Sequence, residues 1–279
     1  MSDTPITPQT RLLHAGRGWR WLAAGWALFR VSPIGWLALV FGYYLLMSLI
    51  GLIPIPFLGM VIAMVLVPGL SMSFMVASRQ AARGEAVRVP LLFSGLRAQT
   101  QKQLQLGVIY FVALMVLMAF TALSDQGALM QLFLEGKRPL AAGPEAQQLV
   151  SGLGLAALLY TPIMLLFWFA PALVAWHAMS VPKALFFSFF ACIINWRAFL
   201  TYGLACILVL FLLPLAVLLS IVLITGGRVQ PEVMGLMFPF LLSLLPTLFA
   251  SFYVSYRDIF DDSPPSPASV DLSLIHISE

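Results

Sequence analysis

His177 and its neighbours are the residues with the clearest potential for chemistry in this sequence. His177 is the only Asp, Glu, Lys, Arg or His within any predicted membrane-spanning segment, and it stands beside Trp176. An ionisable group in a membrane segment is by default a hypothesis of function, because burying its charge in lipid is costly. His177 could gate a path, sense pH or bind a lipid phosphate together with Lys183. The alternative is an interfacial histidine packed beside Trp176, which we favour because amphipathic rings concentrate at that depth.

The tripeptide Asn195–Trp196–Arg197 is a second polar cluster with a possible chemical role. Arg197 could pair with an anionic lipid headgroup while Trp196 anchors at the boundary of the acyl chains, and other cations could extend this basic surface. The candidate headgroup contacts are Arg83, Arg88, Arg97, Lys102, His177, Lys183, Trp196 and Arg197. The alternative, which we favour, is that these cations only determine the topology of the chain.

The sequence contains no recognisable catalytic or metal-binding motif. It has no HExxH, no GxSxG and no Walker loop, and no acidic residue lies within a predicted span. Its two cysteines, Cys192 and Cys206, form no CxxC and no His/Cys pair at metal spacing. We therefore expect a protein without enzymatic activity, cofactor or metal site.

Composition indicates that the elements carrying these residues are helices in a membrane. Apolar residues make up 61% of the 279 residues and charged residues only 9%, whereas a soluble domain carries about 25% charged residues. Uncharged apolar runs of about 18 residues or more are typical of transmembrane helices. The predicted spans are 34–53, 57–78, 106–123, 153–178, 199–225 and 234–256. We expect an all-α polytopic membrane helix bundle with six transmembrane helices.

Three further segments are predicted to lie in the membrane interface. In GRGWRWLAAGWALFR, Trp19, Leu22, Ala23, Trp26 and Phe29 fall on one helical face, and the arginines lie away from it. Residues 78–103 and 180–197 are the second and third candidates for interfacial amphipathic helices. Residues 124–148 are expected to form the longest polar loop.

The distribution of basic residues predicts the orientation of the chain. Three lie in the loops 124–152 and 226–233, and the other twelve lie in the alternate loops and the two termini. The three are Lys137, Arg138 and Arg228. The positive-inside rule then places both termini in the cytoplasm of a bacterial inner membrane. The formal charge of +4 does not indicate nucleic-acid binding, because these cations lie at the ends of apolar spans.

The even-numbered spans share an internal repeat. VPGLSMSFMVASR, APALVAWHAMSVPK and LPTLFASFYVSYR each contain a proline, one small residue and a leucine, followed by a basic residue eleven or twelve positions after the proline. The prolines are Pro68, Pro171 and Pro246, and proline bends membrane helices. The repeat predicts three helical hairpins, each with a kinked returning helix. The alternative is chance recurrence, because membrane helices are enriched in proline and glycine.

Three stretches carry a resemblance to a known family: GRGWRWLAAGWALFRVSPIGW, RGEAVRVPLLFSGLR and FAPALVAWHAMSVPKALFFSFFACIINWRAFLTYG. There the chain resembles uncharacterised multi-pass inner-membrane proteins of proteobacteria, over residues 16–262. The resemblance implies location and topology but no catalytic residues. The architecture is more loosely similar to the membrane domains of some glycerophosphodiester phosphodiesterases. Since the chain lacks their soluble domain, their activity does not transfer.

The chain divides into a membrane domain and short polar ends. We expect a polar N-terminal tail at 1–15, a six-helix membrane domain at 16–260 and a disordered tail rich in Pro, Ser and Asp at 261–271. The final residues, LSLIHISE at 272–279, match the translation of a transposon-end sequencing adapter. We interpret them as read-through that is not native.

Two classes of function remain open. In the first, the protein has a structural, assembly or envelope-maintenance role and acts through the phospholipid bilayer or a membrane-protein partner. In the second, it is a passive transporter or channel for a neutral or amphiphilic solute. A transporter should contain a continuous cavity between the helices that bear Pro68, Pro171 and Pro246, reaching toward the bilayer midplane and lined by Ser, Thr, Tyr or Asn. A core closed by Leu, Phe and Met favours the first class. We favour the first.

Overall fold

The structure is a bundle of helices, in agreement with the predicted fold class. The computed structural model describes residues 10–55, 57–135, 143–224 and 231–260, and within these ranges every regular element is helical. The apolar composition and the absence of charges in long runs account for this, because lipid offers no hydrogen-bond partners and the backbone must satisfy its own polar groups. The expected tail at 261–271 and the adapter-like residues at 272–279 lie outside the described residues.

The helices follow one another with short connections. Their bounds are α1 (Arg17–Val31), α2 (Pro33–Gly51), α3 (Leu58–Ala81), η1 (Val89–Phe93), α4 (Ser94–Arg97), α5 (Thr100–Asp125), α6 (Ala128–Glu135), α7 (Pro144–Phe167), α8 (Ala170–His177), α9 (Val181–Ile194), α10 (Trp196–Ile207), η2 (Leu208–Leu212), α11 (Leu213–Ile224) and α12 (Pro231–Phe260).

Five helical segments of the described chain are long and apolar enough to cross a membrane. They are Pro33–Gly51, Leu58–Ala81, Thr100–Asp125, Gln147–His177 and Trp196–Ile224, and they coincide with the first five predicted spans. The sixth predicted span, 234–256, falls within the 30-residue helix α12. The side chains of residues 231–241 are outside the description, so the count of six remains a prediction.

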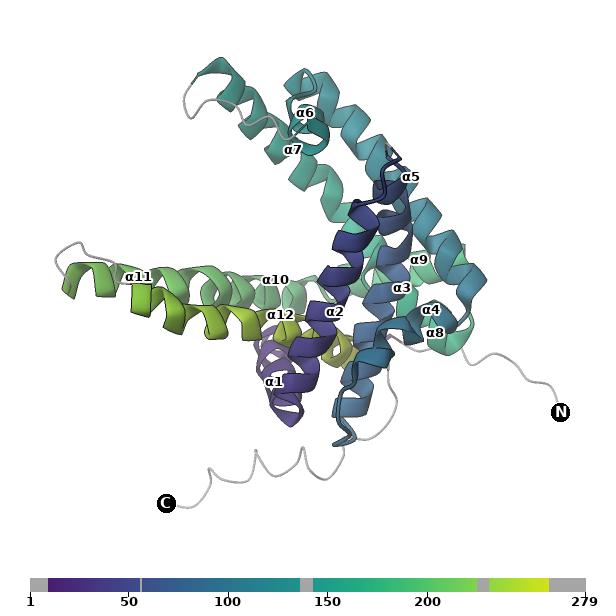
Figure 1. The fold of residues 1–279 in the computed structure, drawn as a ribbon. Coiled ribbons are helices and arrows are strands. Elements are labelled where there is room, and N and C mark those ends of the chain that lie inside the picture. Colours follow the sequence, from purple (N-terminus) through teal and green to yellow (C-terminus); the bar gives the residue numbers. More distant parts are fainter. Residues whose placement is uncertain (1–9, 56, 136–142, 225–230, 261–279) are drawn as a thin grey trace.

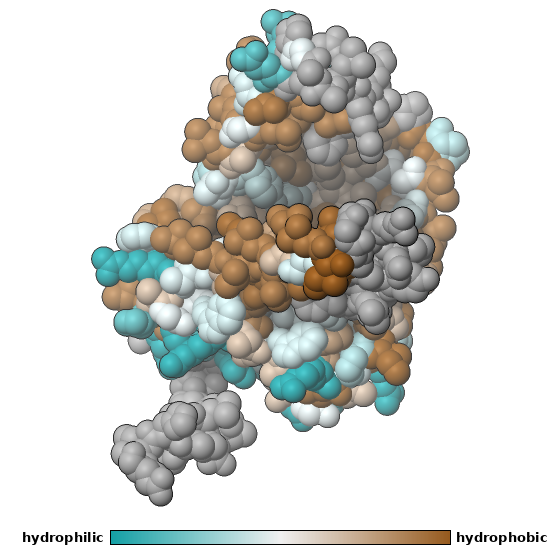
Figure 2. All heavy atoms as spheres, turned by 90° about the vertical axis from the view of Figure 1, so that its left-hand side faces the viewer, coloured by the Kyte–Doolittle hydropathy of each residue, from teal (hydrophilic) through white to brown (hydrophobic). Residues whose placement is uncertain are grey.

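The helix α3 occupies the centre of the bundle and contacts α2, α5, α8 and α12. Two arms diverge from this centre (Figure 1): α5 and α7 run in one direction, and α10 with α11 runs in another. Figure 2 shows the side of the molecule that lies to the left in Figure 1. Hydrophobic side chains cover the middle of this side, a recess lies between the arms, and hydrophilic side chains gather toward the lower end. In the most apolar window of Trp196–Ile224, no residue is buried within the protein.

The first interfacial segment, α1, also contacts other helices of the bundle. Gly18 lies against the backbone of α10 at Ala198 and Tyr202, and Gly25 lies against α12 at Thr247 and Ser251. Small residues allow such close backbone approach between membrane helices. The predicted apolar face is therefore divided. Leu22 and Phe29 are buried in the bundle, whereas Trp19, Ala23 and Trp26 are exposed.

The fourth span is interrupted at Trp168–Phe169, between α7 and α8. Pro171, in the first turn of α8, cannot donate a backbone hydrogen bond. Ser188 of α9 bridges the backbone groups on the two sides of this interruption. Its Oγ accepts a hydrogen bond from the Phe169 amide at 2.9 Å and donates one to the Leu165 carbonyl at 2.8 Å. The third interfacial candidate thus holds a broken span together.

The repeated prolines are all buried, but their settings differ. Pro68 lies inside α3, Pro171 in the first turn of α8 and Pro246 inside α12. The segment that follows α3 is held by Ser73, a serine of the first repeated stretch: its Oγ donates to the Leu92 carbonyl and accepts from the Gly95 amide. The second interfacial candidate is therefore the short pair η1 and α4, packed on α3.

The expected polar loop at 124–148 contains a helix that the sequence analysis did not predict. Asp125, at the end of α5, accepts hydrogen bonds from the amides of Gly127 and Leu129 at 2.9 and 3.0 Å, which caps the start of α6. Gly152 of α7 lies against this carboxylate and leaves no room for a larger side chain. The Asp125 side chain therefore joins α5, α6 and α7.

Candidate functional site

A cavity of about 220 Å³ lies where α3, α8 and α12 end. We call it the α3–α8–α12 pocket. Its lining residues are Arg79, Trp176, His177, Tyr253, Tyr256, Arg257 and Phe260. Pockets for drug-sized ligands are about 300–1,000 Å³, so this cavity suits a smaller chemical group.

The three repeated segments of the sequence build this pocket. Arg79 lies in the last turn of α3, Trp176 and His177 end α8, and Arg257 lies in the last turn of α12. Arg79 and Arg257 each stand eleven residues after the repeated proline of their segment. The repeat therefore places equivalent cations at the same end of two helices that contact each other.

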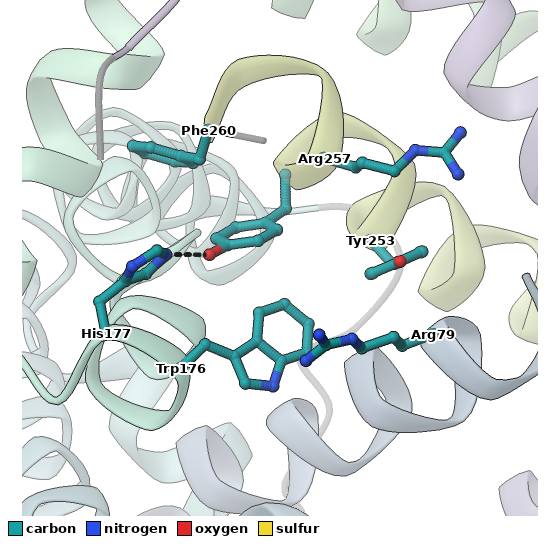
Figure 3. A pocket seen from close by; sticks show the side chains of 7 residues that line it. Arg79, Trp176, His177, Tyr253, Arg257 and Phe260 are labelled. Carbon is teal, nitrogen blue, oxygen red and sulfur yellow. Dashed lines mark hydrogen bonds between the residues drawn. The ribbon is translucent and has the colours of Figure 1, made fainter. Parts of the chain in front are cut away.

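Aromatic rings form the walls of the pocket, and one hydrogen bond joins two of its sides. His177 Nε2 and the Tyr256 hydroxyl are 2.6 Å apart, the pair marked by the dashed line in Figure 3. The Tyr256 ring also meets Trp176 at 4.9 Å and Phe260 at 5.3 Å between ring centroids. Tyr253, Tyr256 and Phe260 are buried. These rings of the pocket wall are therefore held in place by packing against one another.

The pocket carries positive charge that no carboxylate of the described residues neutralises. Arg79 lies over the Trp176 ring at 5.3 Å, and Arg257 lies over the Tyr253 ring at 6.0 Å. Both guanidinium groups are on exposed side chains, and among the described residues the salt bridge found pairs Arg17 with Asp258. The neighbour of Arg257 in sequence, Asp258, is thus engaged elsewhere.

Two side chains of α5 hold α8 in place beside the pocket. Lys102 Nζ donates to the Ala178 carbonyl at 2.7 Å, where the chain turns with a positive φ of 51°. Gln103 is buried, and its Nε2 donates to the Pro171 carbonyl at 2.8 Å. A cation and an amide of α5 therefore bind carbonyls at the two ends of α8.

The structure brings only one of the predicted headgroup contacts, His177, into the pocket. Lys102 binds the Ala178 carbonyl, Lys183 lies over the Phe187 ring at 5.8 Å and Arg197 lies over the Trp196 ring at 5.5 Å. The others, Arg83, Arg88 and Arg97, are exposed on the connection between α3 and α5 and do not line the pocket.

Most residues of the pocket were not predicted as functional from the sequence. Arg79 and Arg257 were interpreted only as determinants of topology, and the tyrosines of α12 were not considered. A signal was present, because the basic residue at a fixed distance from the repeated proline marks both arginines. It could not show that the two helix ends meet.

Metal and thiol chemistry find no support in the described part of the chain. No group of three or more His, Cys, Asp or Glu side chains within it could hold a metal ion. Cys192 is buried in α9, and burial raises the pKa of its thiol. A thiol with a raised pKa is a poor nucleophile and a poor metal ligand at neutral pH.

One comparison with known proteins bears on the whole chain. The chain is 35% identical over 262 residues to a protein of Burkholderia thailandensis named as a probable inner membrane protein. The match covers 91% of this chain and 94% of that protein. No protein-family model and no solved structure matches the chain. The match confirms the resemblance to bacterial inner-membrane proteins without assigning a biochemical activity.

Proposed function

Because the chain belongs to the family of the Burkholderia inner membrane protein, we propose that it has a structural, assembly or envelope-maintenance role in the inner membrane, without catalysis. It acts through lipid or through a membrane-protein partner. The bilayer is its solvent, since five of its helical segments are long and apolar enough to cross it.

The observation that carries this proposal is that aromatic rings fill the space between α3 and α12, two of the helices with a repeated proline. Phe74 of α3 and Phe249 of α12 stack with ring centroids 4.0 Å apart and planes 7° apart. Tyr43 of α2 meets the Phe74 ring edge-on at 5.5 Å. A solute path between α3 and α12 would have to separate these rings.

A second aromatic contact closes the core near the break in the fourth span. Trp168 meets Phe252 of α12 at 4.7 Å and Phe199 of α10 at 5.4 Å. The hydroxyls of Thr247, Ser251 and Ser255 on α12 donate to carbonyls of their own helix. Such local bonds satisfy the hydroxyls without a water-filled path. These contacts favour a role through lipid or a partner over passive transport.

Six crossings with both termini in the cytoplasm complete the proposal. The Arg11 amide donates to the Ile259 carbonyl at 3.0 Å, so the two ends of the described chain lie together. An even number of crossings places both ends on the same side of the membrane, and this contact agrees with that. The 30 residues of α12 extend about 45 Å at about 1.5 Å per residue, which is enough to span the hydrocarbon core.

Solute flux through reconstituted vesicles tests the proposal against transport. Vesicles that contain the full chain should swell in glycerol or in a neutral disaccharide no faster than protein-free vesicles. In cells, deletion of the gene should sensitise the strain to detergent and chelator, and the wild-type gene should restore resistance. Swelling that increases with the amount of protein would support the transport alternative and refute the structural role.

A further inference from the structure

We propose that the α3–α8–α12 pocket binds the phosphate of an anionic lipid headgroup, held by Arg79 and Arg257. This inference rests on the proposed function, because it names the class of lipid through which the protein would act. It follows from four properties of the pocket: its charge, its aromatic faces, its depth and its size.

The charge of the pocket favours an anion. Two guanidinium groups line it, and no carboxylate in the described chain neutralises them. Guanidinium groups present a planar set of donors that matches phosphate oxygens, and such charge-assisted bonds are stronger than neutral ones. Both side chains are long, exposed and line the same pocket, and the proposal requires that both turn toward one bound phosphate.

The aromatic faces disfavour the commonest alternative ligand, a quaternary ammonium such as choline. Aromatic cages bind such cations through the faces of their rings. Here Arg79 already covers Trp176, and Arg257 already covers Tyr253. A further cation would have to displace a guanidinium and would be repelled by the other. The geometry therefore disfavours binding through a choline group and favours a headgroup whose net charge is negative.

The depth of the pocket matches the headgroup layer. Arg79 belongs to the last turn of the span Leu58–Ala81, and His177 is the last residue of the span Gln147–His177. Trp176 and the tyrosines of α12 are the amphipathic rings expected at this level. An anionic lipid in the leaflet would present its phosphate here without leaving the bilayer.

The size of the pocket limits the ligand to a headgroup. A cavity of about 220 Å³ is below the usual range for a drug-sized ligand, so the acyl chains would remain among the lipids. A soluble phosphate ester shares the same chemistry, and the experiment must distinguish the two sources.

The test measures lipid binding to the purified full chain in detergent by native mass spectrometry. Wild type, Arg79→Gln/Arg257→Gln and the control Arg20→Gln/Arg30→Gln are titrated with phosphatidylglycerol and with phosphatidylcholine. Arg20 and Arg30 are exposed on α1 and do not line the pocket, so the control removes the same charge. Inorganic phosphate and glycerol 3-phosphate are titrated in parallel against lipid-free protein.

We expect wild type and control to retain one phosphatidylglycerol, and the pocket variant to bind it about tenfold or more weakly, as expected for lost charge-assisted contacts. Should the double variant fail to fold, Arg79→Gln and Arg257→Gln singly must each weaken binding. Equal affinity for phosphatidylcholine, or an equal loss in the control, would overturn the proposal. Pocket-dependent binding of glycerol 3-phosphate without phosphatidylglycerol would overturn the lipid assignment.

These results are separable from those on the proposed function. Vesicle swelling bears on the transport alternative alone, and it does not require lipid retention at the pocket. A protein that excludes solutes but shows no dependence on Arg79 and Arg257 would refute the site and leave the structural role standing.

Discussion

Arg17 and Asp258 form a two-point ion pair that ties α1 to the end of α12. Arg17 Nε donates to Asp258 Oδ2 at 3.0 Å, and Arg17 Nη2 lies 2.8 Å from Oδ1. The fully buried Trp21 also donates to Oδ2, at 2.7 Å. This carboxylate therefore joins the two ends of the described chain, and no other carboxylate of the described residues pairs with Arg257 beside it.

The first prediction concerns this ion pair. Asp258→Ala should lower the free energy of unfolding by about 1–3 kcal/mol, because the buried Trp21 N–H loses its acceptor. Asp258→Asn keeps an acceptor for Trp21 and should cost less. Thermal unfolding in detergent micelles measures both variants. An Asp258→Ala protein that unfolds like the wild type would show that the ion pair does not hold α1.

A second prediction tests the repair of the broken span. Ser188→Ala leaves the Phe169 amide and the Leu165 carbonyl without their partner and should destabilise the protein by about 1–2 kcal/mol. The matched control is Ser220→Ala, because Ser220 is exposed and donates only within its own helix. Hydrogen exchange at Phe169 should accelerate in the first variant only. Equal exchange in both would exclude the role of Ser188.

The third prediction concerns the close contact between α1 and α12. A side chain at Gly25 would collide with the Thr247 carbonyl and with Ser251, so Gly25→Leu should cost about 1–3 kcal/mol. Gly203 of α10 has open space around it, and Gly203→Leu serves as control. Limited proteolysis near residue 17 should separate the variants. If both resist the protease equally, α1 does not depend on this approach.

The orientation of the chain supplies a fourth prediction. Periplasmic alkaline phosphatase fused after Gly136 or Gly226 should be active, whereas a fusion after Gly84 should be inactive, because most basic residues lie on the side of Gly84. A cytoplasmic reporter fused at the same positions should give the opposite pattern. Cytoplasmic activity at Gly136 or Gly226 would overturn the predicted map of six crossings.

The fifth prediction uses the buried thiol of α9. In a Cys206→Ser protein, Cys192 should react with N-ethylmaleimide at pH 8 much more slowly than free cysteine, since burial raises its pKa and reduces the thiolate fraction. Denaturation should restore full reactivity, as measured by mass. Rapid labelling of the folded protein would place Cys192 at an accessible surface instead.

The first five spans illustrate what could be predicted locally. Each is a continuous apolar run, and transfer of such a run into lipid depends on its own composition. The ends of the five spans therefore differ from the predicted ends by one to six residues. The capped helix α6 was not predicted, and for the fourth span the repeat predicted a kink at Pro171 rather than a break at Trp168–Phe169. Both depend on single side chains, Asp125 and Ser188, that bind backbone groups across turns or helices.

The sequence by itself determined that this chain is helical and dissolved in lipid, and it indicated which of its residues lie at water boundaries. Only the tertiary structure decided that Arg79, His177 and Arg257 meet in one pocket, and that Asp258 turns to Arg17 rather than to its neighbour. The physical reason is that insertion into lipid follows from composition along the chain, whereas helix association in lipid gains nothing from general hydrophobicity and depends on specific close contacts between distant residues.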